Sequence, residues 1–291
     1  MLRALAITMS FLLPTACAQT NAHQRPELGT VTWLTDYDQA LTQARQTQRP
    51  VFLLFQEIPG CATCTGFGRD VLSQPLLQAA IDAAFVPVVM RNNVDGKEGQ
   101  VRERFREPAW NNPVVRFVDA DGKDLLPRQD GIYSPHGMAQ RMVAALEKTK
   151  QPVPGYLRIA LAETDPKTER AVFQMHCFWE GEALLGAVDG VVATSAAFRD
   201  GAEVVAVTFL PDVVAKAKLT EIAQAKSCRP VGTDRVTPAP KSDQQHALGN
   251  TAYAKLELTP MQRTKVHAAL TLGQDPKPWL TPRQLAALAA R

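Results

Sequence analysis

Residues 50–64 read PVFLLFQEIPGCATC, a continuous apolar run followed closely by two cysteines that two residues separate. Such a run predicts a strand that is buried on both faces of a sheet. A helix-forming stretch follows Cys64, so the spacing places Cys61 and Cys64 at a helix N-terminus, within bonding reach of each other. The segment therefore predicts a strand, a pair of thiols and a helix in direct succession.

Further elements are predicted on both sides of this unit. Asp36 is a suitable N-cap for a helix that runs to residue 48, and Asp121-Gly122 favours a hairpin turn. The other elements that the patterns predict are strands at 84–90, 112–119 and 123–126 and a helix at 134–150.

This order of elements resembles the thioredoxin fold over residues 30–150. The resemblance implies that Cys61 is the exposed attacking thiol and that Cys64 is the buried resolving thiol. It also implies that Pro113, before the third strand, forms a cis peptide bond and packs over the disulfide. Gly60 stands where the family usually has tryptophan. A purely structural disulfide is the alternative, although so short a loop adds little stability.

A second thiol lies in the segment VFQMHCFWEGEAL, residues 172–184. An apolar strand-like stretch ends at Cys177, and helix-forming residues begin just beyond it. The partial positive charge of a helix N-terminus favours a thiolate. Phe178 and Trp179 would supply an apolar wall for a small neutral group. This pattern predicts a nucleophile.

Three segments, HCFWEGEALL at 176–185, DGVVAT at 189–194 and GAEVVAV at 201–207, resemble the A-type peptide methionine sulfoxide reductases. The resemblance implies that Cys177 attacks the sulfoxide sulfur and that Phe178 and Trp179 hold the methyl group. It implies that Glu203 protonates the departing oxygen, which requires a carboxylic acid with a raised pKa. The product on Cys177 is a sulfenic acid, which condenses with a second thiol.

The second half also departs from that family. The family carries a longer segment between Thr194 and Glu203, and Phe198 stands where it has a tyrosine. One interpretation is an active reductase, and the other is a domain that kept the fold and lost the chemistry. Cys228 is interpreted either as the resolving thiol for Cys177 or as a buried cysteine at the end of a helix.

The N-terminus predicts export. A short basic start precedes an apolar stretch at 4–13, and Ala16-Cys17-Ala18 supplies the small residues of a cleavage site. We expect a signal peptide at 1–18 and a periplasmic protein. Lipid attachment at Cys17 and a buried first helix are the alternatives. The net charge of +3 over 291 residues gives no indication of nucleic-acid binding.

The sequence therefore predicts an α/β (α+β) protein of two domains, 30–150 and 156–291, joined by a linker at 151–155. It predicts no metal, because zinc needs four convergent ligands, and no cofactor, because no GxGxxG motif occurs. The predicted function is reduction of methionine S-sulfoxide in proteins or peptides. The tethered CxxC pair, at roughly millimolar effective concentration, would regenerate Cys177. Oxidised proteins or peptides and an external membrane thiol-disulfide carrier are the expected partners. The alternative is a thiol-disulfide exchange protein whose C-terminal domain only binds clients.

Overall fold

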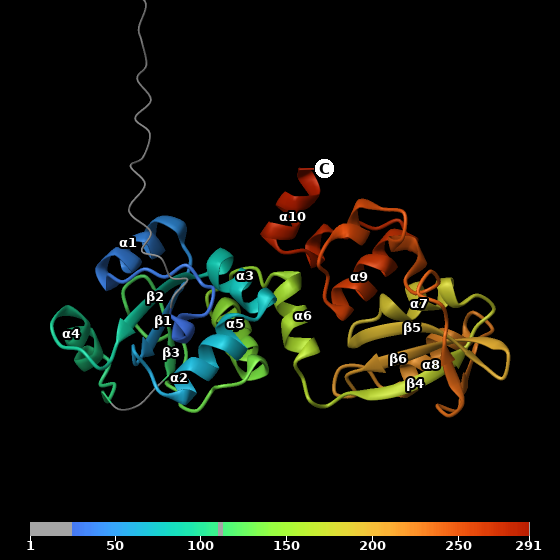
Figure 1. The fold of residues 1–291 in the computed structure, drawn as a ribbon, viewed down its shortest axis with the longest axis horizontal. Coiled ribbons are helices and arrows are strands. Elements are labelled where there is room, and N and C mark those ends of the chain that lie inside the picture. Colours follow the sequence, from blue (N-terminus) through green and yellow to red (C-terminus); the bar gives the residue numbers. More distant parts are fainter. Residues whose placement is uncertain (1–24, 110–112, 291) are drawn as a thin grey trace, which may run out of the picture.

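The computed structural model describes residues 25–109 and 113–290 of the chain, so the predicted signal peptide lies outside the described residues. Two α/β halves follow one another along the long axis of the molecule (Figure 1). Among the described helices, none combines the length and apolar character needed to cross a bilayer.

The N-terminal half is built on a sheet with the order β2-β1-β3. The central strand β1 pairs in parallel with β2 and antiparallel with β3. Every residue of β1 is buried, as its continuous apolar run predicts. The strands are β1 (Val51–Gln56), β2 (Val86–Arg91) and β3 (Val114–Val118).

Five helices pack around this sheet, and side-chain caps begin two of them, at the predicted cap Asp36 and at Ser134. The Asp36 carboxylate accepts a hydrogen bond from the backbone N–H of Gln39, and the Ser134 hydroxyl accepts one from that of Gly137. The helices are α1 (Tyr37–Thr47), α2 (Ala62–Phe67), α3 (Pro75–Ala84), α4 (Lys97–Arg104) and α5 (Pro135–Lys148).

The prediction of a strand at 123–126 was wrong. In this segment the structure has only an isolated bridge, between Val118 and Asp124. The chain cannot extend this ladder because Pro127 has no N–H to donate.

The C-terminal half contains a five-stranded antiparallel sheet with the order β7-β4-β6-β5-β8. Strands β5 and β6 pair with each other, and β7 and β8 are short strands at the two edges. The strands are β4 (Glu169–Gln174), β5 (Val191–Arg199), β6 (Ala202–Phe209), β7 (Arg229–Val231) and β8 (Val236–Pro238).

The helices of this half include two that begin at Thr-Pro pairs. Thr259 and Thr281 each form a capping box with the glutamine three residues later. The helices are α6 (Gly155–Glu163), α7 (Phe178–Gly186), α8 (Lys216–Gln224), α9 (Pro260–Thr271) and α10 (Pro282–Ala289).

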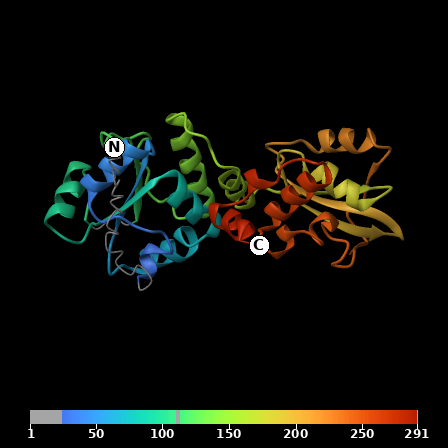
Figure 2. The same ribbon diagram turned by 90° about the horizontal axis from the view of Figure 1, so that it is seen from above.

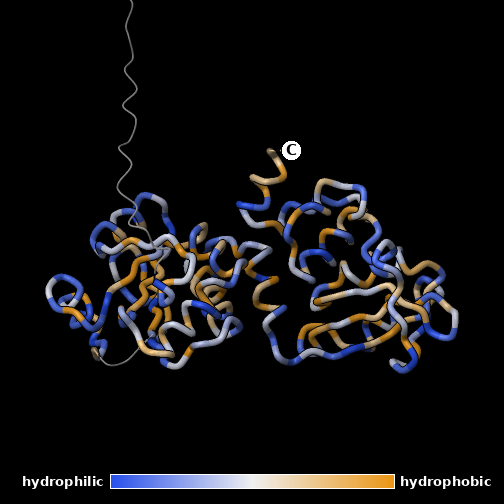
Figure 3. Tube along the Cα trace, viewed as in Figure 1, coloured by the Kyte–Doolittle hydropathy of each residue, from blue (hydrophilic) through white to orange (hydrophobic). Residues whose placement is uncertain are grey.

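The halves share packed side chains as well as the chain that joins them. Helix α6 begins at the end of the predicted linker, and Leu157 and Ile159 are fully buried in the core of the N-terminal half. Val192 and Met261 of the second half belong to the same cluster, and α10 contacts α3. In Figure 2 α6 and α10 lie between the two sheets, and Figure 3 shows apolar residues along α6. The segment at 151–155 is therefore not a free tether.

Candidate functional site

The first candidate site is the pair of thiols at the start of α2. Cys61 directly precedes the helix and is exposed, whereas Cys64 lies in its first turn and is fully buried. The two Sγ atoms are 3.6 Å apart. The structure therefore brings the predicted attacking and resolving thiols together, with the expected difference in exposure.

The surroundings shift the pKa values of the two thiols in opposite directions. A hydrogen bond from the backbone N–H of Cys64 lowers the pKa of Cys61. Burial raises the pKa of Cys64 to about 11. This environment makes Cys61 the more readily ionised of the two thiols and keeps Cys64 protonated at neutral pH.

Hydrogen bonds between side chains and backbone groups hold the turn that precedes these cysteines. The Glu27 carboxylate accepts a hydrogen bond of 2.8 Å from the Gly60 N–H. The buried Gln56 amide donates to the carbonyl oxygens of Glu27 and Cys64, at 2.7 and 3.2 Å. A Cβ atom on Gly60 would lie 2.5 Å from the Cys64 Cβ. The turn therefore has no room for the side chain that the thioredoxin family usually carries at this position.

Pro113 is buried and directly precedes β3. Its peptide bond to residue 112 lies outside the described residues, so the predicted cis geometry stays a prediction. Within the described residues, Ile58–Pro59 is the cis peptide bond.

A third potential metal ligand lies beside the two thiols. One ligand atom from each of Glu57, Cys61 and Cys64 lies within 4.8 Å of the other two. The sequence interpretation missed Glu57. The available signal was an acidic residue between the buried strand and the CxxC motif.

The second candidate site surrounds Cys177, which is half-buried at the N-cap position of α7. Glu203 comes from the neighbouring strand β6. Its carboxylate accepts a hydrogen bond of 2.8 Å from the Phe178 N–H, and its carbonyl oxygen accepts one from the Met175 N–H. The structure therefore brings the predicted nucleophile and the predicted acid to the same strand-to-helix turn.

The two predicted wall residues have different environments. Phe178 is 5% exposed and packs edge-on against Phe198, with the ring centroids 5.5 Å apart. Trp179 is 37% exposed, and its ring stacks on His246 at 4.0 Å. Trp179 is thus the more accessible aromatic surface, and His246 covers one of its faces.

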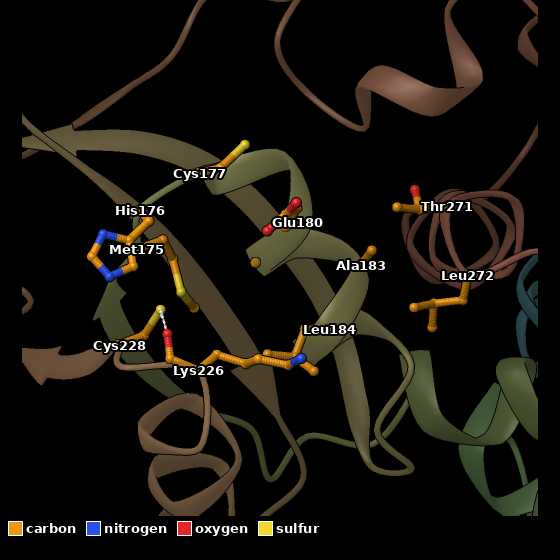
Figure 4. A pocket seen from close by; sticks show the side chains of 11 residues that line it. Met175, His176, Cys177, Glu180, Ala183, Leu184, Lys226, Cys228, Thr271 and Leu272 are labelled. Atoms are coloured by element: carbon orange, nitrogen blue, oxygen red, sulfur yellow. Dashed lines mark hydrogen bonds between the residues drawn. The ribbon is translucent and has the colours of Figure 1, made fainter.

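Cys228 and Cys177 line the same pocket, of about 360 Å³, together with Lys226. Cys228 is buried, and its thiol donates a hydrogen bond to the Lys226 carbonyl oxygen. Figure 4 shows the Cys177 thiol pointing away from Cys228, with Met175 between the two sulfur atoms in this view. A direct bond between these thiols would therefore require the turn at Cys177 to move.

Glu182 is a buried acid that the sequence interpretation did not single out. Its carboxylate accepts hydrogen bonds from the backbone N–H groups of Ala196 and Gln245, at 3.1 and 2.9 Å. Burial raises the pKa of this carboxyl group to about 7, against the opposing effect of these bonds and of Arg263. Because Gln245 precedes His246, Glu182 anchors the loop whose imidazole covers Trp179.

The two candidate sites lie in different halves of the molecule. In Figures 1 and 2 α2 and α7 lie on opposite sides of α6. The structure does not bring Cys61 close to Cys177.

The comparisons with known proteins bear on the first of these sites. Residues 32–120, less than half of the chain, match the family model described as thioredoxin-like. A solved structure described as DsbH oxidoreductase is 19% identical, with a TM-score of 0.35, over 47% of this chain and 97% of its own. No curated protein matches the chain. The family match confirms the predicted thioredoxin-like domain, and it does not extend to the reductase-like segment around Cys177.

Proposed function

We propose that this protein is a thiol-disulfide oxidoreductase whose working pair is Cys61 and Cys64. One observation carries the proposal. An exposed thiol with a lowered pKa lies 3.6 Å from a buried thiol with a raised pKa. This asymmetry separates the attacking role from the resolving role.

In the reducing direction, the Cys61 thiolate attacks one sulfur of a substrate disulfide. The substrate disulfide breaks, one substrate thiolate leaves, and a mixed disulfide forms at Cys61. Cys64 then loses its proton and attacks the Cys61 sulfur, which releases the second substrate thiol. Two electrons pass to the substrate, and a Cys61–Cys64 disulfide remains. We propose that oxidised proteins are the substrates and that an external thiol-disulfide carrier, on the exported side of a membrane, restores the dithiol.

Titration of the full chain in glutathione buffers tests this proposal. We expect a two-electron transition, and either Cys61→Ser or Cys64→Ser should abolish it. The matched control, a protein with both Cys177→Ser and Cys228→Ser, should keep the transition. Cys64→Ser should also accumulate a mixed disulfide with glutathione. A native Cys61–Cys64 disulfide that resists millimolar dithiothreitol would instead identify a structural bond.

The turn at Cys177 favours a second candidate function, which we propose for the C-terminal half: reduction of methionine S-sulfoxide. The supporting observation is the bond from the Phe178 N–H to Glu203, since it holds a carboxylate beside the residue that would attack the substrate. Cys177 attacks the sulfoxide sulfur while Glu203 protonates the oxygen. The products are methionine and a sulfenic acid on Cys177. A second thiol, for which Cys228 is the candidate in the same pocket, displaces water and forms a disulfide.

Turnover of dabsylated methionine S-sulfoxide with dithiothreitol tests this second function. The protein with Cys61→Ser and Cys64→Ser should keep the activity, because dithiothreitol replaces the dithiol, and Cys177→Ser should abolish it. Absence of turnover in the unmodified chain would favour the alternative, a C-terminal half that binds the clients of the thioredoxin-like domain.

A further inference from the structure

Three potential metal ligands converge beside the CxxC motif, although the motif by itself offers only two. Glu57 directly follows β1, Cys61 directly precedes α2, and Cys64 lies in the first turn of that helix. The bend between the strand and the helix returns the Glu57 carboxylate toward the thiols, so that the three ligand atoms lie within 4.8 Å of one another. Two soft sulfur ligands and one hard oxygen ligand form a donor set that suits zinc.

The separation of the two sulfur atoms is close to that of a tetrahedral site. Zinc–sulfur bonds of about 2.3 Å and a zinc–oxygen bond of about 2.1 Å give tetrahedral S···S and S···O separations of about 3.8 and 3.6 Å. The observed Sγ–Sγ distance is 3.6 Å. The Glu57 oxygen lies within 4.8 Å of both sulfur atoms, and rotation about the side-chain bonds of Glu57 can shorten these separations.

The Glu57 carboxylate has no competing partner among the described residues. No hydrogen bond or ion pair to it occurs in residues 25–109 or 113–290. A half-buried carboxylate without a cation is unfavourable, and two neighbouring thiolates would add further negative charge. A divalent cation would offset this charge, and it would also compensate for the ionisation of the buried Cys64 thiol.

We propose that Glu57, Cys61 and Cys64 form an open three-ligand site for Zn²⁺ in the reduced protein. Cys61 is exposed, so a water molecule or a substrate thiolate has access to the fourth position. Binding moves no electrons, and it releases the protons of the coordinating thiols to solvent. A Cys61–Cys64 disulfide supplies no thiolate, so zinc binds the reduced form only. Zinc therefore holds the pair reduced and blocks thiol-disulfide exchange.

Zinc affinity of the reduced full chain, measured by competition with a chromophoric chelator, tests the site directly. Cys17, Cys177 and Cys228 are replaced by serine so that only the CxxC thiols remain. We expect one equivalent of zinc to bind, and we expect Glu57→Gln to weaken the affinity at least about tenfold, the lower end of losses seen even for residues that only support a ligand. Glu103→Gln, at an exposed glutamate of the same half, is the matched control and should bind like the parent.

Two results would overturn the inference. Equal zinc affinities for Glu57→Gln and Glu103→Gln would mean that the dithiol binds zinc adventitiously, without the carboxylate. Unchanged affinity together with slower glutathione exchange of the metal-free Glu57→Gln protein would identify Glu57 as a proton acceptor for Cys64. The zinc affinity is independent of substrate reduction, so a failure of the proposed oxidoreductase function would be seen separately in the glutathione titration.

Discussion

The carboxylate of Glu203 accepts a hydrogen bond of 2.8 Å from the backbone N–H of Phe178, the residue that follows Cys177. Glu203 comes from β6 and Phe178 from the first turn of α7, so strand pairing fixes the carboxylate against the helix that carries the thiol. Because of this contact, one substitution at Glu203 can test the proposed reduction of methionine S-sulfoxide.

Glu203→Gln should lower the turnover of dabsylated methionine S-sulfoxide by about 10²- to 10⁴-fold, because the departing oxygen loses its proton donor. The matched control is Glu169→Gln, which alters an exposed carboxylate at the start of β4 and outside the pocket that Cys177 lines. It should stay within about twofold of the parent, as expected for an exposed charge far from a proton-transfer role. Equal activities of the two variants would show that Glu203 takes no part in the reaction.

Glu182 should make the stability depend on pH. Its folded-state pKa of about 7 lies above the ordinary value of 4.5, so the folded protein holds this proton more tightly. Its stabilising contribution is therefore complete below pH 4.5 and is lost as the pH rises through 7. Glu182→Gln cannot ionise and should gain up to about 3 kcal/mol relative to the parent across this window, since one pKa unit corresponds to about 1.4 kcal/mol.

Urea unfolding of both proteins between pH 4 and 8 measures this difference. Burial lowers the pKa of His267 to about 4, which gives a slope of opposite sign between pH 4 and 6.5. That contribution is present in both proteins and cancels when their free energies of unfolding are subtracted. A difference that is constant with pH would show that Glu182 titrates alike in the folded and unfolded chains.

Gly60→Ala should destabilise the protein by about 1–3 kcal/mol, the usual cost of forcing extra atoms into a packed site. The added Cβ would meet the Cys64 Cβ and the Glu57 carbonyl oxygen, both at 2.5 Å. Gly66→Ala is the matched control in α2, because a Cβ there meets only the end of the Arg69 side chain at 3.9 Å. The control should be stabilised by up to about 1 kcal/mol through helix propensity. Thermal or urea unfolding of the pair would show whether the turn before Cys61 is as tightly packed as these distances imply.

The elements that local patterns determine were predictable from the sequence. The run at 51–56 has too many consecutive apolar residues for a strand with one solvated face, and Asp36 and Thr259 are capping residues wherever they precede a helix. The CxxC pair was predictable for the same reason, since the spacing alone brings both thiols to one helix turn.

Features that depend on tertiary contacts were not predictable. Glu57 meets the thiols only because the chain bends between β1 and α2, and Glu182 is buried only because β5 and the loop at 244–246 close over it. Burial raises the pKa of the Glu182 carboxyl group to about 7, and no local pattern around Glu182 indicated this. The residues after 151–155 likewise gave no sign that α6 would pack into the core of the first half.

The packing of α6 into the core of the first half changes the prediction for electron transfer between the two thiol sites. The sequence predicts that Cys61 swings on the linker to reach Cys177 in the same molecule. In the structure α6 is buried between the halves, and α2 and α7 lie on opposite sides of it. We therefore expect any disulfide between the two sites to form between two molecules.

A mixture of two variants tests this expectation. One carries Cys64→Ser, Cys177→Ser and Cys228→Ser, so that Cys61 is the remaining thiol of the two sites. The other carries Cys61→Ser and Cys64→Ser and keeps only the thiols of the C-terminal half. Replacing Cys17 by serine in both removes the thiol at that position. After peroxide treatment the mixture should form a disulfide-linked heterodimer, and peptide mapping should identify Cys177 or Cys228 as the residue bonded to Cys61.

The decisive comparison is with a single chain that carries only Cys17→Ser and Cys64→Ser. If transfer is between molecules, its cross-linked fraction should fall on dilution, because an intermolecular reaction depends on concentration and a tethered one does not. A cross-link within the monomer that is unaffected by dilution would mean that the contact around α6 opens and that the linker acts as a tether. Absence of any cross-link between the sites would leave Cys177 outside the path of electrons from Cys61, and the C-terminal half would then be better explained as a module that binds clients.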